Sequence, residues 1–175
     1  MTRHIFGQSH FYKVFEYVMH AMYHRHISTL GIKLPHPTQY GFRRGVGIHE
    51  LIFQLRLASE KCLLENKELY VASLDISKAF DRVWREAIIF KMVKYDFPPD
   101  LIYMINFIFH HTRSGVHNGT DPMIFFDTLS GTPQGGILSP DLFALVLHDL
   151  NEALTNLANT TPNTFVTYLL LQHIL

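Results

Sequence analysis

The strongest constraint on the fold is a short apolar run, residues 69–74, that ends in an acidic residue, Asp75. A continuous apolar run of this length predicts a buried β-strand. Sheet-based active sites commonly place their polar side chains at the carboxyl ends of strands. We therefore expect Asp75 to be at least partly accessible at a strand end. The alternative interpretation is structural: the Asp75 side chain caps the turn that follows.

Periodic apolar residues predict helices on both sides of this strand. Residues 10–30 show three-and-four spacing, which predicts a helix that ends near Gly31 and buries Phe11, Val14, Phe15, Val18, Met19 and Met22. A Pro- and Gly-rich loop over residues 34–47 leads to a second helix, whose inward side is expected to hold Leu51, Ile52, Leu55 and Cys62. Further helices are predicted over residues 84–95, over 98–109, and from Pro140 onward with Leu142, Phe143, Leu145, Val146 and Leu150 packed.

A β-hairpin is predicted between the last two of these helices. Residues 113–117 and 123–127 have strand composition and are joined through Asn118-Gly119, and the final apolar run, residues 165–171, is also strand-like. The fold class predicted from this order is α+β, with the 69–75 strand beside the hairpin or the terminal strand and helices on one face. No internal repeat or interdomain linker is visible, so residues 1–175 are expected to form a single domain.

Composition narrows the class of protein. A chain of 175 residues with 47% hydrophobic residues is long enough for one domain with a core. The formal net charge is zero, so any affinity for nucleic-acid phosphates must come from local basic clusters. Two such clusters are present: Arg43 with Arg44, and the group Lys78, Arg82, Arg85, Lys91 and Lys94. The second cluster is equally consistent with a solvated helix face.

Other classes of site are excluded or not expected. Cys62 is the single cysteine, which excludes an intrachain disulfide and a thiolate-rich zinc site. His24-Arg25-His26 and His110-His111 lack helical i, i+4 pairing with a third ligand nearby, so a histidine metal site is not expected. The apolar runs are far shorter than the roughly 18 to 20 residues that span a bilayer, and the N-terminus lacks a signal-peptide core. By default we expect no membrane partner and a soluble, intracellular protein.

A second motif follows Asp75 by about fifty residues, in the run Ser130-Gly131-Thr132-Pro133-Gln134-Gly135-Gly136 that leads to Ser139-Pro140. Its glycines allow close approach of the backbone to a ligand, and Gln134 supplies both a donor and an acceptor. The simpler alternative is a Gly-Pro turn that enters a helix. Together with Leu74-Asp75-Ile76-Ser77-Lys78-Ala79-Phe80-Asp81, this motif resembles the first and second palm motifs of a reverse transcriptase of the LINE (non-LTR retrotransposon) type. Gln39-Tyr40-Gly41-Phe42-Arg43 resembles a segment of the fingers region of the same family.

The resemblance implies a role for each candidate residue. Asp75 would be the catalytic carboxylate that binds two Mg²⁺ ions, and the Ile76 carbonyl would help to hold the nucleotide-bound ion. Phe80 would pack under the sugar and select deoxynucleotides, while Gln134 and Gly135 would lie beside the templating base and the incoming nucleotide. Arg43 would contact phosphate, unless it is an ordinary surface-loop arginine. Asp81 is expected to be a local cap or an ion-pair partner of Arg82 or Arg85. The implied partners are an RNA template, a DNA primer and deoxynucleotides.

The same resemblance implies an incomplete enzyme. Residues 10–66 would form the rear of the fingers and residues 67–175 an incomplete palm, with the thumb absent. If Tyr168 aligns with the aromatic residue of the third palm motif, Leu170 and Leu171 occupy the positions of two expected aspartates and cannot bind magnesium. The leading hypothesis is therefore a truncated or decayed RNA-directed DNA polymerase of a non-LTR retrotransposon, inactive as it stands. One alternative is a noncatalytic fragment that binds nucleic acid or protein, and another is a frameshift after Val166. Exposed apolar surface is expected where the missing parts would pack, which favours self-association.

Overall fold

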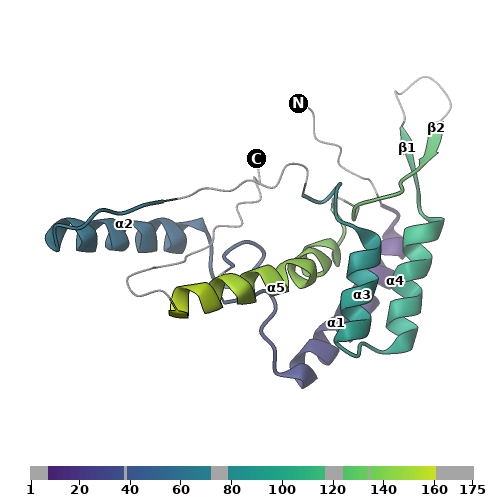
Figure 1. The fold of residues 1–175 in the computed structure, drawn as a ribbon. Coiled ribbons are helices and arrows are strands. Elements are labelled where there is room, and N and C mark those ends of the chain that lie inside the picture. Colours follow the sequence, from purple (N-terminus) through teal and green to yellow (C-terminus); the bar gives the residue numbers. More distant parts are fainter. Residues whose placement is uncertain (1–7, 38, 72–78, 117–123, 134, 161–175) are drawn as a thin grey trace. The chain divides into compact units, whose positions relative to one another are not determined.

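The computed structural model describes residues 8–37, 39–71, 79–116, 124–133 and 135–160 (Figure 1). These residues form five helices and one two-stranded antiparallel sheet. The chain divides into two compact units, Met1–Leu34 with Lys78–Val146 and Pro35–Ser77 with Leu147–Leu175. The expectation of helices combined with a small antiparallel sheet is confirmed in this coarse form.

Helix α1 (His10–Leu30) begins and ends as the sequence predicts. The Ser9 hydroxyl accepts a hydrogen bond from the Tyr12 backbone N–H at 3.2 Å, which satisfies one of the free amides of the first turn. Gly31 follows the last turn with a φ of 67°, a left-handed conformation that glycine adopts without steric cost.

The buried face of α1 is different from the predicted one. Glu16, Met19, Tyr23 and Ile27 are buried, and their spacing places them on one helical stripe. Of the residues predicted to face inward, Met19 is buried as expected and Met22 is partly buried. The other four, Phe11, Val14, Phe15 and Val18, are exposed. The reason is a specific polar contact: the Glu16 Oε1 atom accepts a hydrogen bond from the Leu138 N–H at 3.2 Å, so this stripe faces the protein interior.

Helix α2 (Ile48–Leu64) lies in the second unit. The Glu50 carboxylate accepts a hydrogen bond from the Gly47 N–H at 2.7 Å and so stabilises the first turn. Leu51 is buried as predicted, but Ile52 and Leu55 are exposed and Cys62 is only partly buried. The predicted inward face is therefore wrong beyond Leu51, because apolar periodicity does not by itself supply a surface to pack against.

The predicted buried strand over residues 69–75 is wrong in its described part. Leu69, Tyr70 and Val71 form no strand, and all three side chains are exposed. A strand needs a hydrogen-bonded neighbour. Within the described ranges, the sheet contains the two hairpin strands and no third one. Residues 72–75 and the apolar run 165–171 lie outside the described residues.

Helices α3 (Arg85–Lys94) and α4 (Pro99–His111) lie side by side, and α1 packs against α4 (Figure 1). The Tyr23 ring of α1 stacks on Phe97, in the turn between α3 and α4, with ring centroids 5.0 Å apart. The fully buried aliphatic side chains of this first unit include Ile88, Met92, Leu101 and Ile105. The predicted ranges of both helices are confirmed to within two residues.

Strands β1 (Arg113–Val116) and β2 (Ile124–Asp127) form the predicted hairpin, with Arg113 opposite Asp127. The Arg113 Nε atom donates to Asp127 Oδ1 at 2.8 Å, a cross-strand ion pair that fits this register. Helix α5 (Ser139–Thr160) has Pro140 in its first turn, as predicted. It buries Leu142, Phe143 and Leu145, whereas Val146 is partly buried and Leu150 is exposed against expectation.

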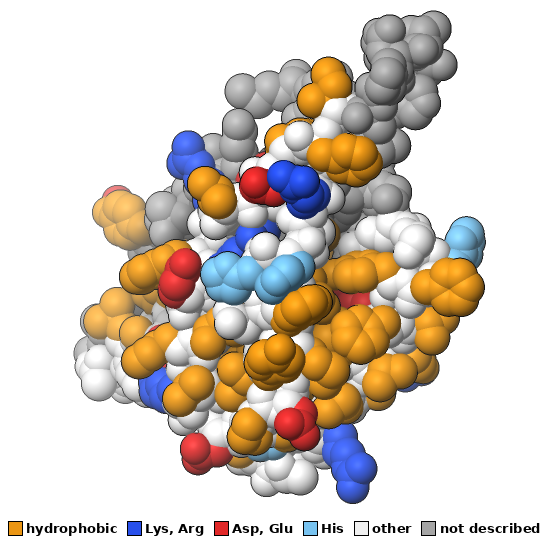
Figure 2. Space-filling model, turned by 90° about the vertical axis from the view of Figure 1, so that its right-hand side faces the viewer, with side chains coloured by type: hydrophobic (Ala, Val, Ile, Leu, Met, Phe, Trp, Pro, Cys, Tyr) orange, Lys and Arg blue, Asp and Glu red, His pale blue; other side chains and the backbone are white. Residues whose placement is uncertain are grey.

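Large hydrophobic side chains also remain on the surface. Figure 2 shows many hydrophobic side chains exposed on one face, with acidic and basic side chains scattered among them. Phe90 and Val93 of α3 and Tyr103 and Phe107 of α4 are among the exposed residues. Large apolar side chains are therefore exposed on the described part of the chain, and both their relation to the missing parts and self-association remain predictions. Within the described part of the chain, no helix is both long and apolar enough to cross a membrane.

Candidate functional site

Two segments from the two sequence motifs are joined directly through their backbones. The Gly131 N–H donates to the Val83 carbonyl and the Thr132 N–H donates to the Phe80 carbonyl, each at 2.9 Å. The Ser130 hydroxyl adds a hydrogen bond to the Asp81 carbonyl at 3.1 Å. We call these contacts between residues 80–83 and 130–132 the motif junction. It places the end of the first motif against the start of the second.

The motif junction requires glycine at position 131. Gly131 has a φ of 82°, which side-chain-bearing residues rarely adopt. A Cβ atom there would lie 2.6 Å from the Phe80 carbonyl oxygen and 2.7 Å from that of Asp81. The backbones therefore approach so closely that no side chain fits between them.

Arg85, the first residue of α3, stabilises the motif junction by donating hydrogen bonds to backbone carbonyls around it. Its Nε atom donates to the Gly131 carbonyl at 2.8 Å, and its Nη1 atom donates to the carbonyls of Phe109 at 2.6 Å and Thr128 at 2.5 Å. The guanidinium also lies 5.2 Å from the centre of the Phe109 ring. Burial lowers the pKa of Arg85 from its ordinary value. Because its donors are used inside the protein, Arg85 acts as a structural link between α3, α4 and the loop that follows β2.

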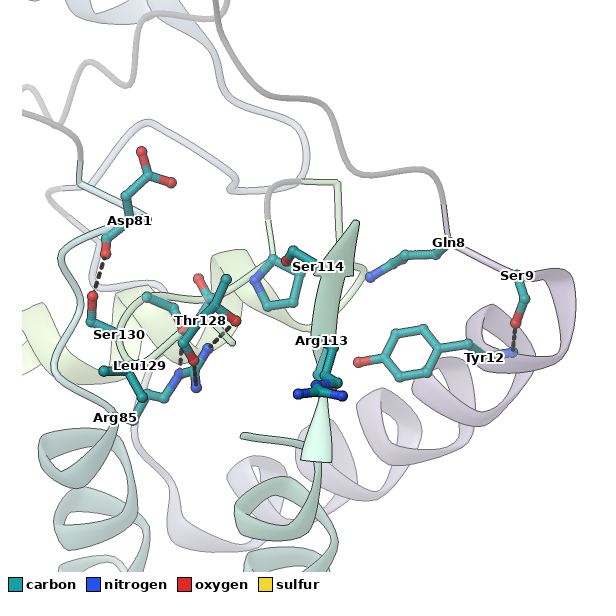
Figure 3. Close-up of a pocket in the computed structure, with 14 residues that line it drawn as sticks. Gln8, Ser9, Tyr12, Asp81, Arg85, Arg113, Ser114, Thr128, Leu129 and Ser130 are labelled. Atoms are coloured by element: carbon teal, nitrogen blue, oxygen red, sulfur yellow. Dashed lines mark hydrogen bonds between the residues drawn. The ribbon is translucent and has the colours of Figure 1, made fainter. Parts of the chain in front are cut away.

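A pocket of about 480 Å³ opens beside the motif junction (Figure 3). Its lining comes from four parts of the first unit: Tyr12 of α1, Asp81, Arg113 and Ser114 of β1, and the loop from Thr128 to Pro133. Asp81 is tied to Ser130 through its carbonyl, and its carboxylate points away from that bond (Figure 3). Burial, together with the negative charge of Glu16, raises the pKa of Tyr12 to about 12. Tyr12 is therefore a neutral hydroxyl at physiological pH.

Glu16 of α1 contacts the segment of the second motif that leads into α5. Its Oε1 atom bonds to the Leu138 N–H, and a Cβ atom added to Gly136 would lie 2.6 Å from that same oxygen. The Ser139 hydroxyl and the Gly136 N–H both donate to the Pro133 carbonyl, at 2.8 and 3.1 Å. Sequence analysis missed Glu16, because a glutamate in an amphipathic helix ordinarily indicates the solvated face. The one feature of the sequence that could have identified Glu16 is its spacing from Met19 and Tyr23, which places all three on the same face of the helix.

The structure describes three of the predicted site residues, and it places one of them, Phe80, against the loop of the second motif. Phe80 is half-buried at the motif junction, and its ring centroid lies 5.5 Å from that of Phe143 in α5. Gly135 is exposed in the second motif with a φ of 97°. Arg43 is in the other unit, where it donates to the Pro37 carbonyl. Asp75, Ile76 and Gln134 lie outside the described residues.

The larger basic cluster predicted from the sequence does not form one solvated face. Arg85 is committed to internal carbonyls, Lys91 is buried, and the Lys94 ammonium lies 5.5 Å from the centre of the Tyr95 ring. Arg82 is exposed, and Lys78 is outside the described residues. The members of this cluster therefore lie in different environments. Arg85 and Lys91 are not part of a solvated basic face.

The described residues that line the pocket do not supply enough carboxylates for a two-magnesium centre. Two-metal catalysis needs carboxylates that hold the ions about 3.5 to 4 Å apart. Among the described residues that line the pocket, Asp81 is the single carboxylate.

Comparison with known proteins establishes the family. Residues 3–169 match the family described as reverse transcriptase (RNA-dependent DNA polymerase). The chain belongs to the reverse transcriptase family. The RNA-directed DNA polymerase from mobile element jockey of Drosophila melanogaster is 35% identical over 119 residues, which cover 64% of this chain and 12% of that protein. Its counterpart from Drosophila funebris is 34% identical over 126 residues, which cover 69% of this chain and 13% of that protein.

A third relative extends the match over more of the chain. It is described as a probable RNA-directed DNA polymerase from transposon X-element of Drosophila melanogaster, and it is 32% identical over 142 residues, 79% of this chain and 15% of its own length. The resemblance to a LINE-type reverse transcriptase is confirmed by these matches. The chain spans less than a sixth of the length of each of these curated relatives. No solved structure shows significant similarity to it.

Proposed function

We propose that this chain is the part of a retrotransposon RNA-directed DNA polymerase in which the first two palm motifs meet. The motif junction is the observation that carries the proposal, because it joins residues 80–83 to residues 130–132 beside a pocket. In this proposal residues 10–66 correspond to the rear of the fingers and residues 67–175 to part of the palm. The partners are an RNA template, a DNA primer and deoxynucleotides.

The proposed residue roles follow the family resemblance. Asp75 and the Ile76 carbonyl are the proposed ligands of Mg²⁺, the ion that would neutralise phosphate charge during nucleotidyl transfer. Phe80 is the proposed contact to the deoxynucleotide sugar, and its place at the motif junction supports this role. Gln134 and Gly135 are assigned to the template and incoming nucleotide, and Arg43 to phosphate.

The first prediction is that the purified chain does not extend a primer. If Tyr168 aligns with the aromatic residue of the third palm motif, Leu170 and Leu171 stand where the family pattern expects aspartates, and hydrocarbon side chains cannot bind magnesium. The assay uses a labelled DNA primer on an RNA template with deoxynucleotides and Mg²⁺. We expect the same background signal from the wild-type chain and from Asp75→Ala. Magnesium-dependent extension by the wild type that Asp75→Ala abolishes would show that the chain is a competent polymerase.

A noncatalytic role is the second candidate, and the apolar surface of α3 and α4 favours it. Fluorescence anisotropy with a labelled RNA–DNA duplex separates the possibilities. Binding that weakens between low and moderate salt supports a nucleic-acid interface built on the few basic residues. Absence of binding at low salt, combined with self-association in analytical ultracentrifugation, supports a protein-interaction fragment instead.

A further inference from the structure

A cluster of two imidazoles and a carboxylate lies on the first unit, apart from the motif junction. His20 and His24 are one turn apart on α1, and Asp141 comes from the first turn of α5. Their Nε2 atoms lie 3.1 and 3.2 Å from the same oxygen, Asp141 Oδ2, and 3.0 Å from each other. Three potential ligand atoms therefore converge on one point.

The spacing of these atoms matches the face of a metal coordination sphere. Ligands about 2.0 to 2.1 Å from a tetrahedral zinc ion are separated from one another by about 3.3 Å. The three measured separations are 3.0, 3.1 and 3.2 Å. An ion in the cluster would need only small adjustments of the three side chains.

Hydrogen bonding alone accounts poorly for the same arrangement. The Asp141 oxygen can accept from both histidines, but each Nε2 atom must then carry a proton. Two donors would face each other at 3.0 Å, which is unfavourable. Neutral imidazoles that direct lone pairs toward one cation avoid this conflict.

The cluster is also both anchored and accessible. The Asp141 side chain is 14% exposed, and its backbone carbonyl accepts a hydrogen bond from the buried Tyr23 hydroxyl at 3.2 Å. His20 and His24 are 30% and 43% exposed, so an ion can enter from solvent and keep one position for water. Fixed ligands that need little reorganisation favour metal binding.

We propose that His20 Nε2, His24 Nε2 and Asp141 Oδ2 bind a divalent first-row transition metal of the zinc type. Two imidazoles with one carboxylate suit such ions, whereas magnesium prefers oxygen ligands alone. The ion would tie α1 to the start of α5 and so support the loop that precedes this helix. This inference is independent of the proposed polymerase function. The sequence analysis expected no histidine metal site, because it overlooked His20 as the i, i+4 neighbour of His24 and because the third ligand lies 117 residues further on from His24.

The test measures metal binding by the full 175-residue chain, prepared without a histidine tag and stripped of metal. Zn²⁺ is titrated against a chromogenic chelator, and Co²⁺ serves as a spectroscopic probe of coordination. The variants are His20→Ala, His24→Ala and Asp141→Asn. The matched controls are His10→Ala, an exposed histidine of the same helix, and Asp100→Asn, a first-turn acid of α4. Circular dichroism checks that each variant is folded.

We expect one zinc ion per wild-type chain and unchanged affinity in both controls. Each ligand variant should bind at least about tenfold more weakly, because even residues outside the coordination sphere commonly contribute that much. In the wild type, zinc should shift the imidazole ¹⁵N resonances of two histidines, a result that does not depend on whether any variant folds. The proposal is wrong if the wild type shows no saturable binding. It is also wrong if His10→Ala weakens binding as much as His20→Ala, which would indicate diffuse binding to surface histidines.

Discussion

At the scale of single residues, Gly131 is the position where the structure most clearly restricts the sequence. The sequence identified the loop around it as functional because of its glycines and Gln134. The structure supplies a reason at one glycine, where two backbones approach too closely for a side chain. Glu16 and Asp141 could not be found in this way, since each acts on residues more than 110 positions away. Their roles come from tertiary contacts that local spacing does not encode.

Substitution of Gly131 by alanine is expected to destabilise the fold strongly. A positive φ alone costs an alanine roughly 1 to 2 kcal/mol, and the contacts with the Phe80 and Asp81 carbonyls add to this. We predict a loss of about 3 kcal/mol or more in the free energy of unfolding, measured by urea denaturation. Gly45→Ala is the matched control, because Gly45 has a φ of 79° and open space around it. Equal losses in the two variants would show that the backbones are not in close contact at Gly131.

At the scale of elements, the accuracy of the sequence predictions depended on how local each element is. The hairpin of β1 and β2 and the extents of α1, α3 and α4 were predicted correctly, because caps, turns and nearest neighbours determine them. Residues 69–71 were predicted wrongly, because a strand requires a distant partner. The buried faces of α1 and α2 were also largely wrong, since they depend on which surface each helix meets.

Arg85 provides a test at this scale, because it links α3 to the end of α4 and to the loop after β2. Arg85→Ala leaves the carbonyls of Phe109, Thr128 and Gly131 without their charged donor. We expect a loss of about 2 kcal/mol in the free energy of unfolding, since Arg85 remains partly exposed and water can replace some of these bonds. The exposed neighbour Arg82 is the control, and Arg82→Ala should change stability by no more than about 0.5 kcal/mol. An unchanged free energy of unfolding in Arg85→Ala would contradict the structural role assigned to this guanidinium.

At the scale of the whole molecule, the account depends on two motifs that are distant in the sequence and adjacent in space. Family membership rests on the match over residues 3–169, and the motif junction brings residues 80–83 against residues 130–132. The resemblance predicted that they share a site, whereas composition and periodicity could not. Asp75 and Gln134 lie outside the described residues, so their mutual position remains a prediction.

Amide hydrogen exchange of the 175-residue chain, followed by NMR, tests the motif junction most directly. The Gly131 and Thr132 amides lie in a loop, yet each donates to a carbonyl of residues 80–83 at 2.9 Å. We predict that both exchange at least about 100-fold more slowly than amides of an unstructured chain, and that Gly131→Ala removes the protection of Thr132. Exchange of both amides at the unstructured rate, while amides within α3 and α4 stay protected, would contradict the junction and with it the proposed meeting of the two motifs.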